Sequence, residues 1–427
     1  YKRQALRHEP LVDVHMSLLD MYTYHQARDL SSHTRFVYEY VCGRGSVETK
    51  RALMQRVVHL IADPHAASVR KTYALRVLLN PMLVSSYAAK EAPLSVETQV
   101  SVASSQKPEC AHTIVSAANH EPLLNKEMVL LVVNQVWRIV QGHGMAMFTD
   151  DELRVELLQM STLILEHGAD VLAAEGTSKL DAIKFGWSFL SLEDVTVKHA
   201  AYLFISRFLQ KFESPIKITG QVYVGLLRLT PSDGRALVRR ALDTLVPALP
   251  ERVPSKDGQT PLWVKWTKRT LLDEGHNVLQ LCSILQLLVR YSDLFYDSRD
   301  LFVPHMVTSL AKLGFASSST AESKKLAIQL IDLLIKWDLP SSADTDAQGG
   351  DAESVSRKRI KTGTDTYADS STATLASAFP SVSYSMPLHL RDLVFRFLVR
   401  FISLSMESIT ANDVTKHAFS LLEQVHR

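Results

Sequence analysis

The fold of this chain is decided by stretches such as His199–Phe212, which reads HAAYLFISRFLQKF. Apolar side chains recur there every three to four residues, the spacing that places them on one face of an α-helix. The same spacing returns along the chain and is clearest at Ala236–Leu249, Val278–Arg290 and Leu326–Leu339. The sequence therefore predicts a succession of amphipathic helices.

Breaks at proline separate the helical segments, because proline removes a helical hydrogen bond and clashes with the preceding turn. Examples are Asp63-Pro64, Asn80-Pro81 and Ser214-Pro215. Helix starts are also visible, since Thr149 with Glu152 and Ser319 with Glu322 have the spacing of a capping box. We predict an all-α fold, a HEAT/armadillo-like helical-repeat solenoid of stacked antiparallel helix pairs, with an irregular helical bundle as the alternative.

Three regions follow from composition. Residues 1–339 are predicted to form the stacked-helix solenoid section, and residues 386–427 to continue the helical repeats. Residues 340–385 are rich in Ser, Thr, Asp, Ala and Gly, so we expect a disordered linker. That linker carries a basic cluster typical of a nuclear-localisation signal, or else a solvated charge cluster balanced by nearby acids. Its basic residues are Arg357, Lys358, Arg359 and Lys361.

Composition limits the class of protein. The 427 residues are 46% hydrophobic and 22% charged, with a formal net charge of +2, so neither a strong attraction to nucleic acid nor sequence-specific binding to it is expected. No apolar run reaches the roughly 20 residues that span a bilayer, so no membrane partner is expected. Three scattered cysteines, Cys42, Cys110 and Cys282, indicate a reducing compartment. Because the chain begins without Met, we expect it to be a piece of a longer protein.

No pattern typical of catalysis is present. The N-terminal histidines His8, His15, His25 and His33 form no HExxH pair, and no cysteines have zinc-ligand spacing. Asp150, Asp151 and Glu152 cluster at a helix start, where the exposed amides favour negative charge. We predict no catalytic, cofactor-binding or metal-binding residue, and therefore not an enzyme.

One segment combines aromatic and basic residues in a way that suits contact with a protein partner. The candidate contact patch consists of Trp263, Lys265, Trp266, Lys268 and Arg269. The alternative is an ordinary amphipathic helix start, because side chains three apart share a face and the two tryptophans could both be core. Two further tryptophans, Trp187 and Trp337, lie in apolar helical patterns and are expected to be core anchors.

A series of short segments carries a resemblance to a known family. In order they are Leu78–Leu83, Gly234–Leu242, Val246–Pro250, Trp266–Arg269, Glu274–His276, Pro304–Val307, Leu313–Phe315, Leu326–Ile331 and Lys336–Leu339. In this order and spacing they resemble the TRRAP (transformation/transcription domain-associated protein) family of pseudokinases related to phosphatidylinositol 3-kinase. The resemblance is dense over residues 185–339 and sparser before them.

This resemblance implies a specific function. Members of the family are scaffold subunits of SAGA-type histone acetyltransferase complexes, on which transcription activators dock. The chain would be an internal helical-repeat section of such a coactivator, non-catalytic and nuclear, with activators and acetyltransferase-complex subunits as partners. The alternatives are the helical-repeat region of an active kinase of the same superfamily, or a HEAT-type nuclear transport receptor.

Overall fold

The computed structural model describes eleven stretches of the chain. They are residues 13–17, 19–20, 35–42, 45–91, 122–143, 147–229, 235–255, 258–316, 319–338, 384–406 and 413–426. These residues form helices joined by short turns and contain no strand, so the prediction of an all-α fold is confirmed for them. Contacts between residues divide the chain into two compact units, Tyr1–Trp266 and Thr267–Arg427.

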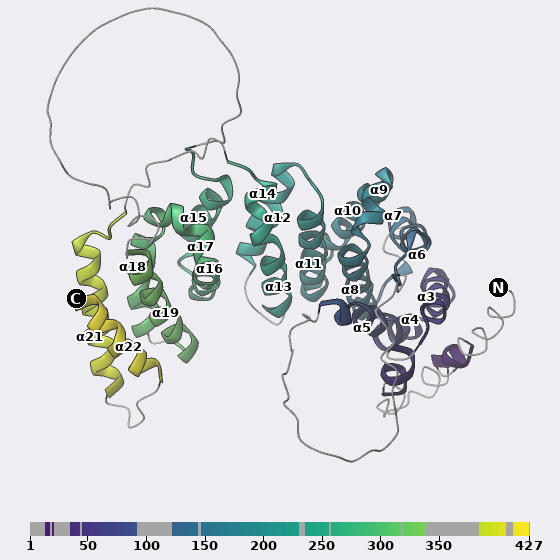
Figure 1. Cartoon of the computed structure of the whole chain (residues 1–427), viewed down its shortest axis with the longest axis horizontal. Helices are drawn as coiled ribbons and strands as arrows, with labels where there is room; N and C mark the ends of the chain where they lie inside the picture. The colour runs from purple at the N-terminus through teal and green to yellow at the C-terminus, as the bar shows by residue number, and fades with distance from the viewer. Residues whose placement is uncertain are drawn as a thin grey trace, which may run out of the picture. The chain divides into compact units, whose positions relative to one another are not determined.

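The first unit contains most of the helices (Figure 1). They are η1 (Val37–Cys42), α3 (Val47–Ala62), α4 (Ser68–Tyr73), η2 (Ala74–Leu79), α5 (Asn80–Glu91), α6 (Lys126–Val132), η3 (Val133–Trp137), α7 (Arg138–His143), α8 (Asp151–His167), α9 (Ala169–Ala174), α10 (Gly176–Leu190), α11 (Val195–Lys211), α12 (Ile216–Arg228), α13 (Arg235–Leu245), η5 (Val246–Ala248) and α14 (Leu249–Arg252). Helix α15 (Leu262–Glu274) contains the boundary between the units.

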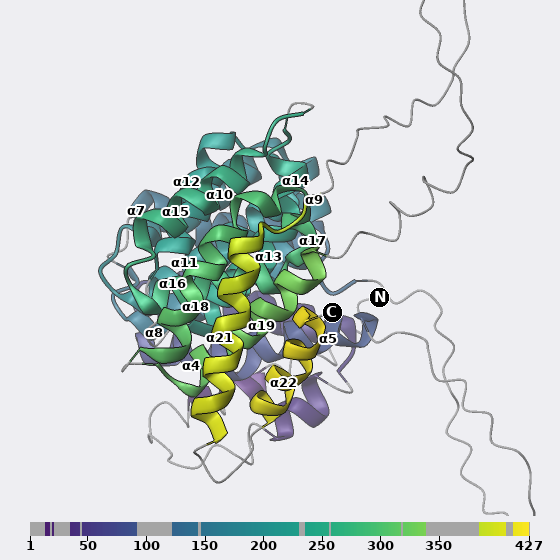
Figure 2. The ribbon, with the colours of Figure 1, turned by 90° about the vertical axis from the view of Figure 1, so that its left-hand side faces the viewer.

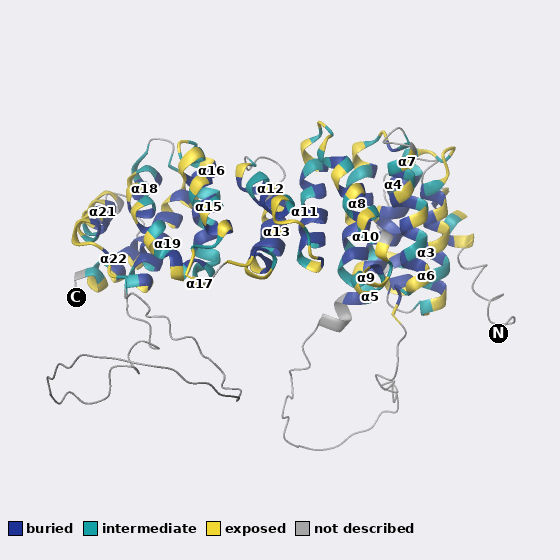
Figure 3. Ribbon diagram, turned by 90° about the horizontal axis from the view of Figure 1, so that it is seen from above, coloured by how far each residue is buried: buried dark blue, intermediate teal, exposed yellow. Residues whose placement is uncertain are grey.

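Helix α11 lies at the centre of the packing in the first unit. It contacts α8 on one side and α13 on the other, and α10 and α12 also pack against it (Figure 1). From Val197 to Gln210 no residue of α11 is exposed, whereas α8, α10, α12 and α13 each keep exposed residues (Figure 3). The apolar spacing of His199–Phe212 predicts one buried helix face, and the structure buries α11 on more than one side because helices pack against it from both sides.

Aromatic side chains fill the core between α10, α11 and the π-helical turn η3. Trp137 is fully buried and its ring centroid lies 5.8 Å from that of Phe185 and 6.1 Å from that of Phe204. The indole N–H of Trp137 donates to the hydroxyl of Ser161 on α8 at 3.0 Å. A buried indole needs such a partner, and this one ties η3 to α8.

The second unit is built from α16 (Val278–Arg290), α17 (Ser292–Phe295), η6 (Tyr296–Leu301), α18 (Val303–Phe315), α19 (Ala321–Asp338), α21 (Leu388–Met406) and α22 (Asp413–His426). Helix α19 contacts α16, α18 and α22, and α21 packs beside α22 (Figure 2). Trp337 near the end of α19 is 3% exposed, so the prediction that it is a core anchor is confirmed. Trp187 on α10 is 40% exposed, so the same prediction was wrong for it.

Both predicted capping boxes lie one residue from the caps that form. Asp150, and not Thr149, caps α8, its carboxylate accepting from the amide of Glu152 at 3.2 Å. At α19 the amide of Ser323 donates to the hydroxyl of Thr320 at 3.2 Å, while the Thr320 amide donates back to the Ser323 hydroxyl at 2.9 Å. Asp150 is preferred at α8 because Asp is a stronger cap than Thr. Thr320 is preferred at α19 because the Ser323 hydroxyl accepts from its amide in return.

The expected break at Asn80-Pro81 does not occur. The π-helical turn η2 runs directly into α5, and the Asn80 amide donates to the carbonyl of Leu75, five residues back. A turn of this kind is wider than an α-turn and shifts the hydrogen bonding by one residue, and the helix continues past Pro81. The breaks at Asp63-Pro64 and Ser214-Pro215 do separate helices.

Residues 339–383, most of the expected linker, lie outside the described residues. The two helices α21 and α22 lie within 386–427, the region expected to continue the repeats. Within the described part of the chain, no single helix has the length and hydropathy to cross a membrane. One pair, Val278–Arg290 with Ser292–Leu301, passes the same criteria together, bent by 94° between its members.

Candidate protein-interaction surface

Helix α10 exposes large side chains on one face. Leu180 is 58% exposed and Trp187 is 40% exposed, and the exposed Lys184 lies between them. Residues at positions i, i+4 and i+7 of a helix share one face, so the three side chains form a single stripe. We call Leu180, Lys184 and Trp187 the α10 stripe. Tryptophan is among the residues most enriched at the centres of protein interfaces.

The opposite face of α10 packs against α11 and determines the orientation of the helix. Phe185 and Phe189 are fully buried there, with their ring centroids 4.9 Å apart. Gly186 lies so close to α11 that a Cβ at this position would be 2.6 Å from Phe204 Cδ1 and 2.9 Å from Ile205 Cγ1. Because this contact holds α10 on α11, the following residue, Trp187, is turned away from the core.

The predicted contact patch on α15 is divided between the core and the surface. Trp263 is buried, and Trp266 is half-buried with its ring within 3.2 Å of the position that a Cβ on Gly220 of α12 would occupy. Lys265 is exposed on the same helix. In the first unit the two tryptophans therefore contribute to packing, which is the alternative that the sequence left open.

The two remaining residues of that patch belong to the second unit. Arg269 is exposed and pairs with Asp273 at 3.7 Å, one helical turn further on. Lys268 is half-buried near His305, whose pKa is lowered by burial first and by the charge of Lys268 second. A role of these five residues in binding a partner stays a prediction. The basic cluster Arg357, Lys358, Arg359 and Lys361 lies outside the described residues.

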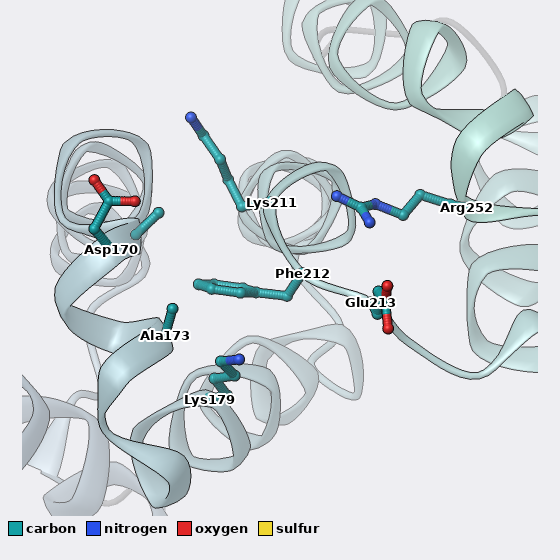
Figure 4. Close-up of a pocket in the computed structure, with 8 residues that line it drawn as sticks. Asp170, Ala173, Lys179, Lys211, Phe212, Glu213 and Arg252 are labelled. Atoms are coloured by element: carbon teal, nitrogen blue, oxygen red, sulfur yellow. The ribbon is translucent and has the colours of Figure 1, made fainter.

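A polar pocket of about 560 Å³ lies at the C-terminal end of α11 (Figure 4). It is lined by Ala169, Asp170, Ala173, Lys179, Lys211, Phe212, Glu213 and Arg252. The Lys179 ammonium lies 5.2 Å from the centroid of the Phe212 ring, and Arg252 donates to the carbonyl of Gln210 at 2.7 Å. Cations at a helix C-terminus satisfy its free carbonyls and its negative dipole, so this charge is explained by the end of α11.

Reactive groups are dispersed over the described residues. No three His, Cys, Asp or Glu side chains of that part come close enough together to hold a metal ion. His199 on α11 is buried, and this burial lowers the pKa of its ring because the charged form is penalised, although Asp194 opposes the shift. The buried carboxylate of Glu156 accepts from Arg76 Nε at 2.7 Å and from Asn80 Nδ2 at 2.9 Å. These contacts join α8 to η2 and α5, which is a structural role.

Comparison with known proteins finds a family model that matches almost the whole chain. Residues 3–427 match the family described as the Tra1 HEAT repeat ring region, which confirms the predicted helical-repeat class. The chain is 30% identical over 331 residues to the probable transcription-associated protein 1 of Dictyostelium discoideum, covering 78% of the chain and 7% of that protein.

Two further relatives have informative names. The SAGA complex/NuA4 acetyltransferase complex subunit TRA1 of Saccharomyces cerevisiae is 33% identical over 282 residues, which are 64% of this chain and 7% of the relative. The transformation/transcription domain-associated protein of Homo sapiens is 29% identical over 326 residues, 73% of this chain and 8% of the relative. The chain thus spans less than a tenth of the length of each of these proteins.

Proposed function

The chain belongs to the Tra1 HEAT repeat ring family, and from this premise we propose that it is a non-catalytic docking section of a transcription coactivator. In this role it binds transcription activators and subunits of a histone acetyltransferase complex, and so helps to bring acetylation to chromatin. The observation that carries the proposal is the family match over residues 3–427, together with relatives named as SAGA and NuA4 acetyltransferase complex subunits.

The structure supports this proposal through the way its helices pack. Stacked helices hold one another by their apolar faces and leave their outer faces free for partners. Docking requires a firmly held surface with a few large side chains and does not require a reacting group. The α10 stripe has these properties, because Gly186 and Phe185 fix the helix while Trp187 faces outward.

The two alternative hypotheses make different predictions. An active kinase would carry a catalytic loop and a metal-binding Asp in another part of its sequence, and a transport receptor would bind transport factors. The relatives are named as transcription-associated proteins and acetyltransferase complex subunits, which favours the coactivator.

The proposal includes a nuclear location. Arg357, Lys358, Arg359 and Lys361 are the proposed import signal, since closely spaced basic residues are what import factors bind. Replacing these four residues with Ala in a reporter that carries residues 340–385 should reduce its nuclear accumulation. Replacing Asp344, Asp346, Asp351 and Glu353 with Asn or Gln is the matched control and should leave import intact. Equal nuclear entry of the wild-type and Ala reporters would remove this assignment.

The direct test of the proposal is affinity purification of the tagged full-length protein that contains this chain, followed by mass spectrometry. We expect acetyltransferase and SAGA-type adaptor subunits at near-stoichiometric amounts, and none of them from an untagged strain. Recovery of kinase regulators or transport factors without any acetyltransferase would contradict the proposal.

A further inference from the structure

Helix α10 has two apolar faces, and only one of them is used inside the first unit. The inner face carries Ala182, Phe185 and Phe189, all fully buried. The outer face carries the α10 stripe of Leu180, Lys184 and Trp187. An amphipathic helix normally shows one apolar face, and a second apolar stripe on an exposed side marks a contact that the described residues do not supply.

The outer face is a lateral surface of the helix stack. Helix α10 contacts η3, α7 and α9, which precede it, and α11, which follows it. The stack therefore continues on both sides of α10 within the first unit. Stacking a further repeat onto an end of the unit would not cover the stripe, so its occupant has to approach from the side.

The α10 stripe carries one charged group, the ammonium of Lys184. The carboxylate of Asp181 beside the stripe is already engaged by Arg138 Nε at 2.8 Å, and the Gln141 side chain donates to the Asp181 carbonyl at 2.9 Å. Lys184 makes no ion pair with any described residue. The exposed carboxylate of Glu193 lies beyond the helix, in the loop to α11. An exposed tryptophan and leucine on either side of an unpaired lysine favour an apolar partner that carries carboxylates.

We propose that the α10 stripe docks an amphipathic helix of a partner protein, with apolar side chains at i, i+3/i+4 and i+7 and a carboxylate placed to pair with Lys184. Trp187 supplies the main apolar contact and Leu180 the second. A ridge of side chains one helical turn apart fits the groove on another helix, which is the usual geometry of helix pairs. Nucleic acid would require several unpaired cations in a row, and the stripe contains Lys184 alone.

This inference rests on the proposed docking function and adds the chemistry of the partner to it. The test uses the purified full-length protein and a synthetic, fluorescent 18-residue helical peptide with Leu and Phe at the apolar positions and Glu beside them. A second peptide carries Lys in place of each Glu. We expect saturable binding of the Glu peptide, about thirtyfold weaker binding with Trp187→Ala, and roughly tenfold weaker binding with Lys184→Glu.

A charge exchange makes the test specific. Lys184→Glu should prefer the Lys peptide, whereas wild type prefers the Glu peptide. Lys324→Glu and Leu279→Ala are matched controls, because both positions are exposed on other helices, and they should bind the Glu peptide as wild type does. Absence of saturable binding, equal affinity of wild type and Trp187→Ala, or no exchange of preference would overturn the inference. Recovery of acetyltransferase subunits with the full-length protein tests the proposed function separately, so the two can fail independently.

Discussion

Helices α10 and α19 have similar apolar patterns, and each has a tryptophan in its last two turns, but the two tryptophans differ in environment. Trp337 of α19 is 3% exposed, whereas Trp187 of α10 is 40% exposed. Helix α19 is contacted by α16, α18 and α22 of its unit. Helix α10 is contacted by α11, η3, α7 and α9. Apolar spacing thus identifies which residues share a face, and the placement of the neighbouring helices, not their number, decides which faces are buried.

The largest effect on stability is expected for the buried tryptophan, Trp337. Trp337→Ala should lower the free energy of unfolding of the second unit by about 3–5 kcal/mol, because it removes a large buried side chain and leaves a cavity. Local opening of α19, measured by amide hydrogen exchange in the full-length protein, reports this loss. A change below about 1 kcal/mol would mean that Trp337 is exposed and that the comparison fails.

The second largest effect on stability is expected at Gly186, where α10 approaches α11 closely. Gly186→Ala places a methyl group against Phe204 and Ile205 and should destabilise the α10–α11 pair by about 1–3 kcal/mol, since neither ring nor branched chain can retreat in a filled core. Thermal unfolding and hydrogen exchange of α11 measure the effect. A matched control is Lys184→Ala on the outer face, which should stay within about 0.5 kcal/mol of wild type. Similar stability of both variants would contradict the close approach.

The two helices also differ at their first turns: α19 begins with a reciprocal cap between Thr320 and Ser323, whereas α10 begins without a side-chain cap. Thr320→Ala should cost about 1 kcal/mol, since the Ser323 amide loses its acceptor. Ser323→Ala should cost a similar amount, and the double variant less than the sum, because the two residues satisfy each other's amides. Hydrogen exchange of the first turn of α19 gives these values. Strictly additive effects would show that the reciprocal cap is not formed.

The smallest effect on stability is expected at Trp187. Trp187→Ala should change the free energy of unfolding by less than about 1 kcal/mol because much of the side chain is already in water. Its measurable effect is instead on binding, as proposed for the α10 stripe. A loss of 3 kcal/mol or more would place Trp187 in a core, as the sequence alone had indicated.

The fold class could be predicted because helical spacing depends only on local sequence. The apolar residues of His199–Phe212 needed no knowledge of their neighbours to indicate a helix. The helix caps were misplaced by one residue because Thr149 and Asp150 are both competent caps, and the choice depends on where the chain enters the helix. The helix continues through Pro81 because the π-helical turn η2 precedes it, whereas the proline itself is a signal for a break.

The candidate surface was less predictable than the fold. The aromatic and basic residues around Trp263 were visible in the sequence, but Trp263 is buried, which depends on packing that spacing does not report. The α10 stripe was missed because Trp187 was assigned to the core. A signal was present, since Phe185 and Trp187 cannot both face the same side of one helix. The outer side chains Leu180 and Trp187 are exposed, and docking is proposed for them.

The α10 stripe is exposed in this chain, and the proposed docking would cover it when the complex assembles. Hydroxyl-radical footprinting of the full-length protein, alone and in the purified acetyltransferase complex, tests it on the two tryptophans. We expect Trp187 to be oxidised rapidly in the protein alone and at least about tenfold more slowly in the complex, while Trp337 stays protected in both. Equal oxidation of Trp187 in both samples, or its protection already in the protein alone, would contradict the claim.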